Sequence, residues 1–147
     1  MINNLLKYNV NNWELFLLKK VNSTMDEIKK EVYESKNTSN ILLMAYKQNK
    51  GRGRRQNKWI SDLGNLFLSI KLNSFKPSKA FTLNYLTGIV LYDTINFFFN
   101  AKKNLFIKWP NDILVDEKKI AGILIDTISH GSKICNFYIG IGLNTKF

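Results

Sequence analysis

Short apolar segments separated by turn residues constrain the fold of this chain more than any other feature of its sequence. Segments of this kind, bounded by Gly, Pro, Asn, Asp or Ser, are typical of β-strands. The expected strands are residues 13–21, 41–46, 65–72, 106–109, 113–115, 120–129 and 134–143. Residues 65–72 alternate apolar and polar side chains, as a half-buried strand does. Pro110 cannot donate to a strand ladder and marks a strand end, and residues 116–118 form a hairpin turn.

Two segments have the pattern of α-helices. Ser23 and Thr24 are candidate N-caps, and Asp26 and Glu27 stand where acidic residues favour a helix start. Met25, Ile28 and Val32 then recur at helical spacing, which predicts a helix over residues 24–35 with these side chains on its apolar face. The second predicted helix covers residues 79–99. Its apolar side chains should be largely buried: Phe81, Leu83, Leu86, Ile89, Val90, Tyr92 and Ile95.

Strands and helices do not alternate strictly along the chain, so the expected fold class is α+β. The sheet should be mixed, mostly antiparallel, and packed by helices. At 147 residues with 45% hydrophobic composition, the chain is expected to form a single domain with its own core. Polar residues interrupt the second helix at Thr82, Asn84 and Asp93, which argues against a membrane span.

Cysteine usage and the N-terminus indicate a reducing compartment. The single cysteine, Cys135, excludes an internal disulfide framework, and with the single histidine, His130, it cannot build a metal cluster unless carboxylates contribute. The first residues lack the apolar run of a signal peptide. We therefore expect a cytoplasmic, soluble protein with no membrane partner.

The formal net charge of +11 raises the question of nucleic-acid binding. The excess lysines are spread along the whole chain and do not form one basic segment. The chain is also rich in Asn, Ile, Phe and Tyr, as proteins of A+T-rich genomes are, and compositional drift explains much of the basicity. Net charge alone therefore does not predict a nucleic-acid partner.

Residues 48–59, Q-N-K-G-R-G-R-R-Q-N-K-W, are called the flap below. Gly51 and Gly53 allow backbone angles that side chains forbid and permit close approach of a ligand. Arg52 and Arg54 provide guanidinium groups suited to carboxylate or phosphate, and Trp59 provides a flat apolar face for stacking. The pattern is neither a Walker loop nor a Rossmann fingerprint. The flap suits an anionic, ring-bearing ligand, although a solvated hairpin tip would look similar.

Three further motifs follow the flap in order. They are K-W-P-N-D at residues 108–112, K-K-I-A-G-I-L at residues 118–124 and G-I-G-L-N at residues 140–144. Taken singly, the first reads equally well as a strand–turn boundary and the second as a hairpin tip. In this order and together with the flap, they resemble the biotin protein ligases, and the resemblance extends from Ser23 to Asn144.

The resemblance implies a fold and a reaction. The fold is that of the biotin protein ligase catalytic core, which is similar to class II aminoacyl-tRNA synthetases. Such enzymes use ATP and Mg²⁺ to convert biotin to biotinyl-5′-AMP with release of pyrophosphate. They then transfer biotin to one lysine of the biotin carboxyl carrier domain of a carboxylase. Attack of a carboxylate on a phosphate brings two anions together, which requires preorganised cations and donors.

The resemblance also implies roles for individual residues. Biotin would be bound by Ser23, Thr24, Gln48, Gly51, Arg52, Lys119 and Gly122. The nucleotide would be bound by Arg54, Arg55, Trp59, Lys108, Asn111 and Asn144. Catalytic roles would fall to Lys119, Arg54 and Asp112. No direct metal ligand is assigned, and Mg²⁺ would lie near Asn111.

The sequence departs from the family pattern in several ways. Gln56 and Asn57 stand where the family commonly has a small and a basic residue. We expect a single catalytic domain over residues 1–147, with no N-terminal helix-turn-helix domain and no C-terminal small β-barrel domain. The oligomeric state stays open, with a homodimer as one option.

Three other functions compete with this interpretation. A lipoate–protein ligase shares the fold, but its flap usually carries a histidine, which is lacking here. Octanoyl transfer through a thioester would depend on Cys135, which lies among apolar neighbours where an inert thiol is expected. A basic nucleic-acid-binding module would place the flap arginines on phosphates, but it leaves the K-W-P-N-D motif and Lys119 unexplained.

Overall fold

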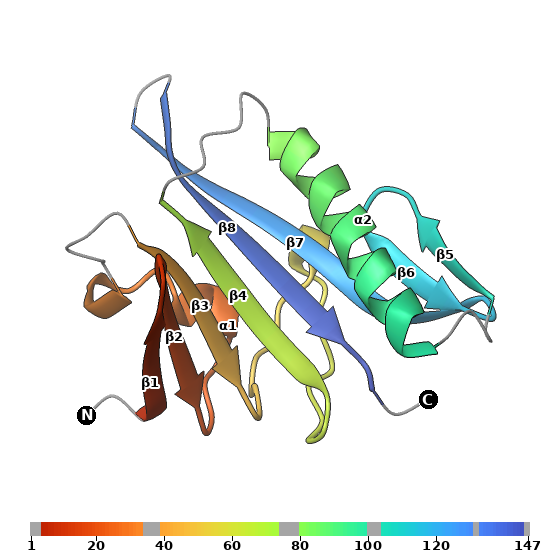
Figure 1. Ribbon diagram of the computed structural model, residues 1–147, viewed down its shortest axis with the longest axis horizontal. Coiled ribbons are helices and arrows are strands. Elements are labelled where there is room, and N and C mark those ends of the chain that lie inside the picture. The colour runs from red at the N-terminus through yellow and green to blue at the C-terminus, as the bar shows by residue number, and fades with distance from the viewer. Residues whose placement is uncertain (1–3, 34–38, 74–79, 100–103, 131–132, 146–147) are drawn as a thin grey trace.

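The structure is a computed structural model. It is built around one eight-stranded sheet (Figure 1). The described residues are 4–33, 39–73, 80–99, 104–130 and 133–145. The strands are β1 Asn4–Val10, β2 Trp13–Leu18, β3 Asn40–Ala45, β4 Leu66–Leu72, β5 Leu105–Lys108, β6 Asp112–Val115, β7 Lys118–His130 and β8 Lys133–Leu143. Their order is β1-β2-β3-β4-β8-β7-β6-β5. Within this sheet β2 and β3 are parallel, and the other neighbours are antiparallel. The predicted mixed, mostly antiparallel sheet is confirmed.

All seven predicted strands are present, with small shifts at their ends. The turn between β6 and β7 lies at Asp116 and Glu117, which have φ angles of 46° and 66°. The prediction missed β1, which pairs with β2 through a turn at Asn11 and Asn12. Asn11 has a φ of 49°, which asparagine tolerates better than most residues. An Asn-Asn pair between two strand-like segments was therefore the available hairpin signal.

The predicted helix over residues 24–35 starts at the predicted residue, Thr24, but its predicted length is wrong. The structure has a four-residue helix, α1 (Thr24–Glu27), and a 3-10 turn, η1 (Glu31–Tyr33), while residues 34 and 35 lie outside the described part. The chain turns so that Tyr33 packs edge-to-face on Phe16 of β2, with ring centroids 5.0 Å apart. Val32, predicted to be on the apolar face, is exposed. Packing against the sheet therefore prevails over the local helical spacing.

The second helix, α2 (Ala80–Phe99), has the predicted extent, but its predicted burial is partly wrong. Leu83, Leu91 and Ile95 pack against the sheet. Leu86, Ile89 and Val90 are exposed by 47%, 50% and 64%. The helix is apolar around its circumference and covers the sheet with only one side, so periodicity could not identify the buried face. Among the described residues, no helix has the length and hydropathy needed to cross a bilayer.

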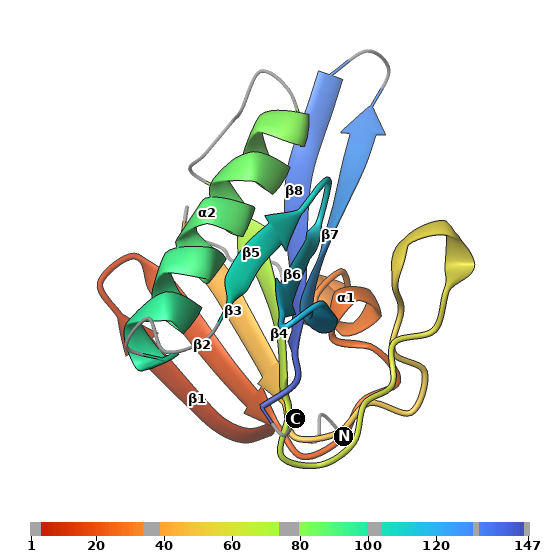
Figure 2. The ribbon, with the colours of Figure 1, turned by 90° about the vertical axis from the view of Figure 1, so that its right-hand side faces the viewer.

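The two faces of the sheet carry different layers. Figure 2 shows α2 on one side, and α1 with the yellow flap on the other. One apolar core lies between α2 and the strands around β7 and β8. A second core lies between α1 and strands β2 and β3. Cys135 belongs to β8, but its side chain lies outside the described part of the chain, so its predicted burial stays a prediction.

Candidate functional site

A small cavity lies at the base of the flap, on the α1 side of the sheet. Its free volume is about 50 Å³, far below the roughly 300 Å³ of a typical ligand pocket. Nine of the predicted site residues line it: Ser23, Thr24, Gln48, Arg52, Arg54, Trp59, Asn111, Lys119 and Gly122. The structure thus brings together residues separated by almost one hundred positions. A ring-bearing ligand can enter only if the flap or its side chains move.

Trp59 fills the cavity by lying directly on the sheet. Gly122 of β7 and Gly142 of β8 are opposite each other in the strand register. A Cβ atom at Gly142 would come within 2.4 Å of the indole, and one at Gly122 within 2.9 Å. The two glycines therefore form a shallow trough that receives the ring. The buried indole Nε1 has no hydrogen-bond partner among the described residues.

A chain of buried hydrogen bonds forms the second wall of the cavity. Gln48 Oε1 accepts from the Thr24 N–H at 2.7 Å and from Thr24 Oγ1 at 3.1 Å. Ser69 Oγ on β4 donates to Thr24 Oγ1 at 2.9 Å. Gln48 Nε2 donates to Ser61 Oγ at 3.0 Å, and Ser61 Oγ donates to the Trp59 carbonyl. Ser23 adjoins this chain and is 2% exposed. A neutral polar ring could exchange hydrogen bonds with such a set.

The flap itself is a narrow two-stranded stem. The N–H of Gly53 donates to the Asn57 carbonyl at 2.7 Å, and the N–H of Trp59 donates to the Gly51 carbonyl at 2.9 Å. The expectation that Gly51 and Gly53 use angles forbidden to side chains is not met. The left-handed residues of the flap are Arg55 and Gln56, with φ of 53° and 63°.

Gly51 is nevertheless required by close packing. A Cβ at Gly51 would come within 2.5 Å of the Trp59 carbonyl oxygen and 2.6 Å of Ser61 Oγ. The close approach at Gly51 is therefore made by the protein's own chain. A need for glycine at position 51 was predicted correctly. The predicted reason, close approach of a ligand, differs from the packing that the structure shows.

Two cations stand at the open side of the cavity. Arg54 Nη1 donates to Asn111 Oδ1 at 2.7 Å, and Asn111 Nδ2 donates to the Ile123 carbonyl of β7. Lys119 Nζ lies 2.8 Å from Asp112 Oδ1 and 5.1 Å from the centroid of the Trp59 ring. The Lys119–Asp112 contact is a close ion pair whose angles are not those of a hydrogen bond. Both cations are placed to meet an anion that enters beside the indole.

Arg52 points instead toward two carboxylates. Its Nε lies 2.9 Å from Asp26 Oδ1, and its Nη2 lies 3.0 Å from Asp126 Oδ2. Asp126 Oδ2 also accepts from Lys29 Nζ at 2.6 Å. Burial acts to raise the pKa of Asp126, but Lys29 and then Arg52 outweigh it and hold the pKa below 3.8.

Several predicted residues lie outside the cavity. Arg55 is exposed on the flap, and Lys108 is exposed at the end of β5. Asn144 follows β8, where its N–H donates to the Ile120 carbonyl. Ser61, Ser69 and Asp126 belong to no motif and were not predicted as site residues. Ser69 and Asp126 share the cavity's face of the sheet through strand register, a relation that local spacing does not contain.

The described residues contain no group of three or more His, Cys, Asp or Glu side chains that could hold a metal ion. The side chains with oxygen atoms beside Lys119 and Arg54 are Asp112 and Asn111. Mg²⁺ commonly uses one or two carboxylates and takes its other ligands from phosphates and water. This donor set therefore fits a magnesium ion carried by a nucleotide, and it does not fit a metal site made of protein alone.

Comparison with known proteins identifies the family. The model of the Biotin/lipoate A/B protein ligase family matches residues 17–144. The biotin–[acetyl-CoA-carboxylase] ligase of Paracoccus denitrificans is 33% identical over 103 residues, which cover 69% of this chain and 43% of that protein.

Solved structures agree in fold. The biotin protein ligase from Aquifex aeolicus, in complex with biotin and ATP, aligns with a TM-score of 0.74 and 31% identity, covering 90% of this chain and 53% of that one. The biotin protein ligase from Leishmania major, in complex with biotinyl-5-AMP, aligns with a TM-score of 0.75 and 26% identity, covering 90% and 57%. The predicted catalytic-core fold is confirmed. This chain spans about half the length of these relatives, and it belongs to the biotin/lipoate A/B protein ligase family.

Proposed function

We propose that this chain activates biotin with ATP to form biotinyl-5′-AMP and transfers the biotinyl group to a lysine of a carboxylase's carrier domain. One observation carries the proposal. A single cavity combines the buried Thr24–Gln48 hydrogen bonds, the Trp59 indole and the cations Arg54 and Lys119. Such a site offers a polar end for a neutral ring and a cationic end for a carboxylate and a phosphate.

The first step joins two anions. A biotin carboxylate oxygen attacks the α-phosphorus of ATP, and pyrophosphate leaves. Lys119, between Asp112 and the indole, would neutralise charge where the new bond forms. Arg54, on the flap, would hold the adenylate. Gly122 would let the backbone approach the biotin tail once Trp59 has moved onto the adenine.

The second step needs an acceptor amine. The lysine of the carrier attacks the biotinyl carbonyl, AMP leaves, and an amide is formed. Asp112 is the carboxylate nearest Lys119 and would accept the proton that the amine loses. Asp112 and Asn111 would also hold Mg²⁺ with the phosphates, where the ion supplies positive charge to the leaving pyrophosphate.

Biotin binding tests the polar end of the site. Thr24→Val keeps the side chain's shape but removes the hydroxyl that donates to Gln48. We expect calorimetry to show biotin binding by the wild-type chain and about tenfold weaker binding by Thr24→Val, since a hydrogen bond to a buried group is lost. Thr94→Val on α2, where the hydroxyl donates only within its own helix, is the matched control. Equal biotin affinity for all three proteins, or binding of lipoate but not biotin, would contradict the proposal.

A further inference from the structure

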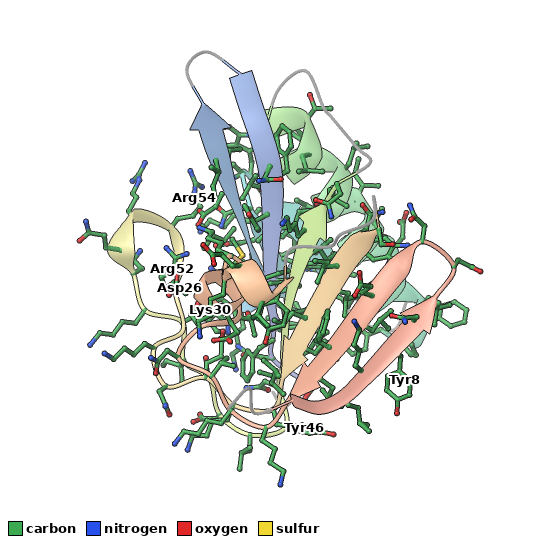
Figure 3. The ribbon with its side chains drawn as sticks, turned by 90° about the vertical axis from the view of Figure 1, so that its left-hand side faces the viewer. Tyr8, Asp26, Lys30, Tyr46, Arg52 and Arg54 are labelled. Atoms are coloured by element: carbon green, nitrogen blue, oxygen red, sulfur yellow. The ribbon has the colours of Figure 1, made fainter. Side chains whose placement is uncertain are left out.

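The Arg52 side chain ties the flap to the body of the protein through two carboxylates that no motif predicted as site residues. Asp26 belongs to α1, and Asp126 lies on β7. Figure 3 shows Arg52 and Asp26 together between the flap and α1. We propose that Asp126 and Asp26 are positioning residues that hold the flap closed over the cavity by binding Arg52. The inference extends the proposed function to the control of its intermediate.

The position of Arg52 within the flap explains how its ion pairs with the two carboxylates can fix the position of Trp59. Arg52 forms an antiparallel bridge with Lys58, and its neighbours Gly51 and Gly53 make the hydrogen bonds of the stem. Fixing the Arg52 guanidinium therefore fixes the stem on both sides. Trp59 continues the opposite side of the stem, so its indole is placed on the sheet by the same contact.

The two carboxylates hold Arg52 from different elements. Asp26 contacts Nε at 2.9 Å, and Asp126 contacts Nη2 at 3.0 Å, so the guanidinium uses separate nitrogens. The Arg52 side chain is 40% exposed, and the carboxylates are 52% and 24% exposed. Ion pairs of this exposure are weak and salt-sensitive. They suit a flap that must open for ligand entry and close again.

Lys29 competes with Arg52 for the same oxygen. Its Nζ lies 2.6 Å from Asp126 Oδ2 and 5.5 Å from the Tyr138 ring centroid. Because Lys29, in the turn after α1, contacts the same oxygen, it limits the strength of the ion pair between Asp126 and Arg52. Without the Lys29 charge, Asp126 would form an ion pair with Arg52 only. Asp126 should then hold the flap more firmly.

Limited trypsin cleavage without ligand tests the contact itself. Trypsin cuts after Arg54 and Arg55 at the flap tip, and mass spectrometry separates these cuts from a cut after the buried Lys71, which reports global unfolding. We expect flap cleavage to be about two- to fivefold faster in Asp126→Asn, the range that one exposed ion pair allows, and faster still in Asp26→Asn/Asp126→Asn. In 1 M salt, where screening acts within about 3 Å, the wild type should approach the variants.

Two further variants serve as controls. Glu27→Gln removes an α1 carboxylate whose 2.6 Å ion pair is with Lys30 and not with the flap, so flap cleavage should stay at the wild-type rate. Lys29→Gln should cleave no faster than wild type. Wild-type cleavage in the double aspartate variant, or acceleration in Lys29→Gln and Glu27→Gln as well, would overturn the proposal.

A second readout links the flap to the reaction. With biotin and ATP, Asp126→Asn should release more activated biotin, measured as biotin attached to a bystander protein such as serum albumin, and Asp126→Glu should restore retention. Unchanged bystander labelling in an active Asp126→Asn variant would show that Asp126 does not position the flap for catalysis. If no variant, wild type included, attaches biotin, the proposed function fails, while the cleavage result still decides whether the carboxylates hold the flap.

Discussion

Glycines shape this site because they have no side chain, and they matter as much as the residues with functional groups. Gly122 and Gly142 leave room for the Trp59 indole, and Gly51 leaves room for the Trp59 carbonyl. From the sequence, Gly51 and Gly122 were predicted as biotin-binding residues that let a ligand approach, and Gly142 was given no role. In the structure, the Trp59 indole occupies the space above Gly122 and Gly142.

Gly142→Ala tests this packing. Its new Cβ would lie 2.4 Å from the indole, so the ring must leave the trough. We expect a loss of about 1–3 kcal/mol in the free energy of unfolding, typical of overpacking. Acrylamide quenching of Trp59, in a Trp13→Phe/Trp109→Phe background, should increase. Gly53→Ala is the control, because the nearest atom to its Cβ is 3.4 Å away. A Gly142→Ala protein with wild-type stability and quenching would show that the indole does not rest on the glycines.

Lys119→Ala separates catalysis from stability. The Lys119 side chain is 42% exposed, and exposed ion pairs contribute about 0–1 kcal/mol, so chemical denaturation should show little change. Removing a preorganised charge from the reacting groups should lower adenylate formation about 100-fold or more. Near-normal turnover of Lys119→Ala, or a large loss of stability, would refute the role given to this lysine.

At the scale of secondary-structure elements, motifs and periodicity predicted the strands well and the helices less well. Alternation identified β4, but its apolar positions 66, 68, 70 and 72 are only half-buried, and the polar Ser69 and Lys71 are buried on the opposite face. The segment after Thr24 kept a helical pattern yet stops after one turn, since Tyr33 gains more by packing on Phe16. Asp126 was not found because its partners, Lys29 in the turn after α1 and Arg52 in the flap, are far from it in sequence, and only the three-dimensional arrangement brings them together.

The contact between β7, α1 and the flap predicts a pH dependence. The pKa of Asp126 is lowered in the folded protein, so the folded state favours its ionised form. This stabilisation is present above the unfolded-state pKa, near 3.8, and is lost as the pH falls through the folded-state pKa. Urea unfolding should show Asp126→Asn less stable than wild type at pH 7, with the difference unchanged down to pH 5 and shrinking below pH 4. A difference that grows on acidification would contradict this sign.

At the scale of the whole molecule, both faces of the sheet carry an apolar core, but the candidate site lies on only one of them. The face covered by α2 holds one of the two cores. The other face carries α1, the flap and the three glycines of β7 and β8. The class of fold followed from the pattern of short strands. The convergence of the motifs on one face depended on the strand order, in which β8 lies between β4 and β7, and that order cannot be derived from local sequence.

The central claim is that this cavity activates biotin as an adenylate, and ATP–pyrophosphate exchange on this chain measures that step without any carrier protein. The assay should be run with biotin, with lipoate and with no acid added, and Lys119→Ala should accompany the wild type. We predict exchange that depends on biotin and is nearly abolished in Lys119→Ala. Exchange that depends on lipoate instead, or no exchange with any acid, would contradict the account.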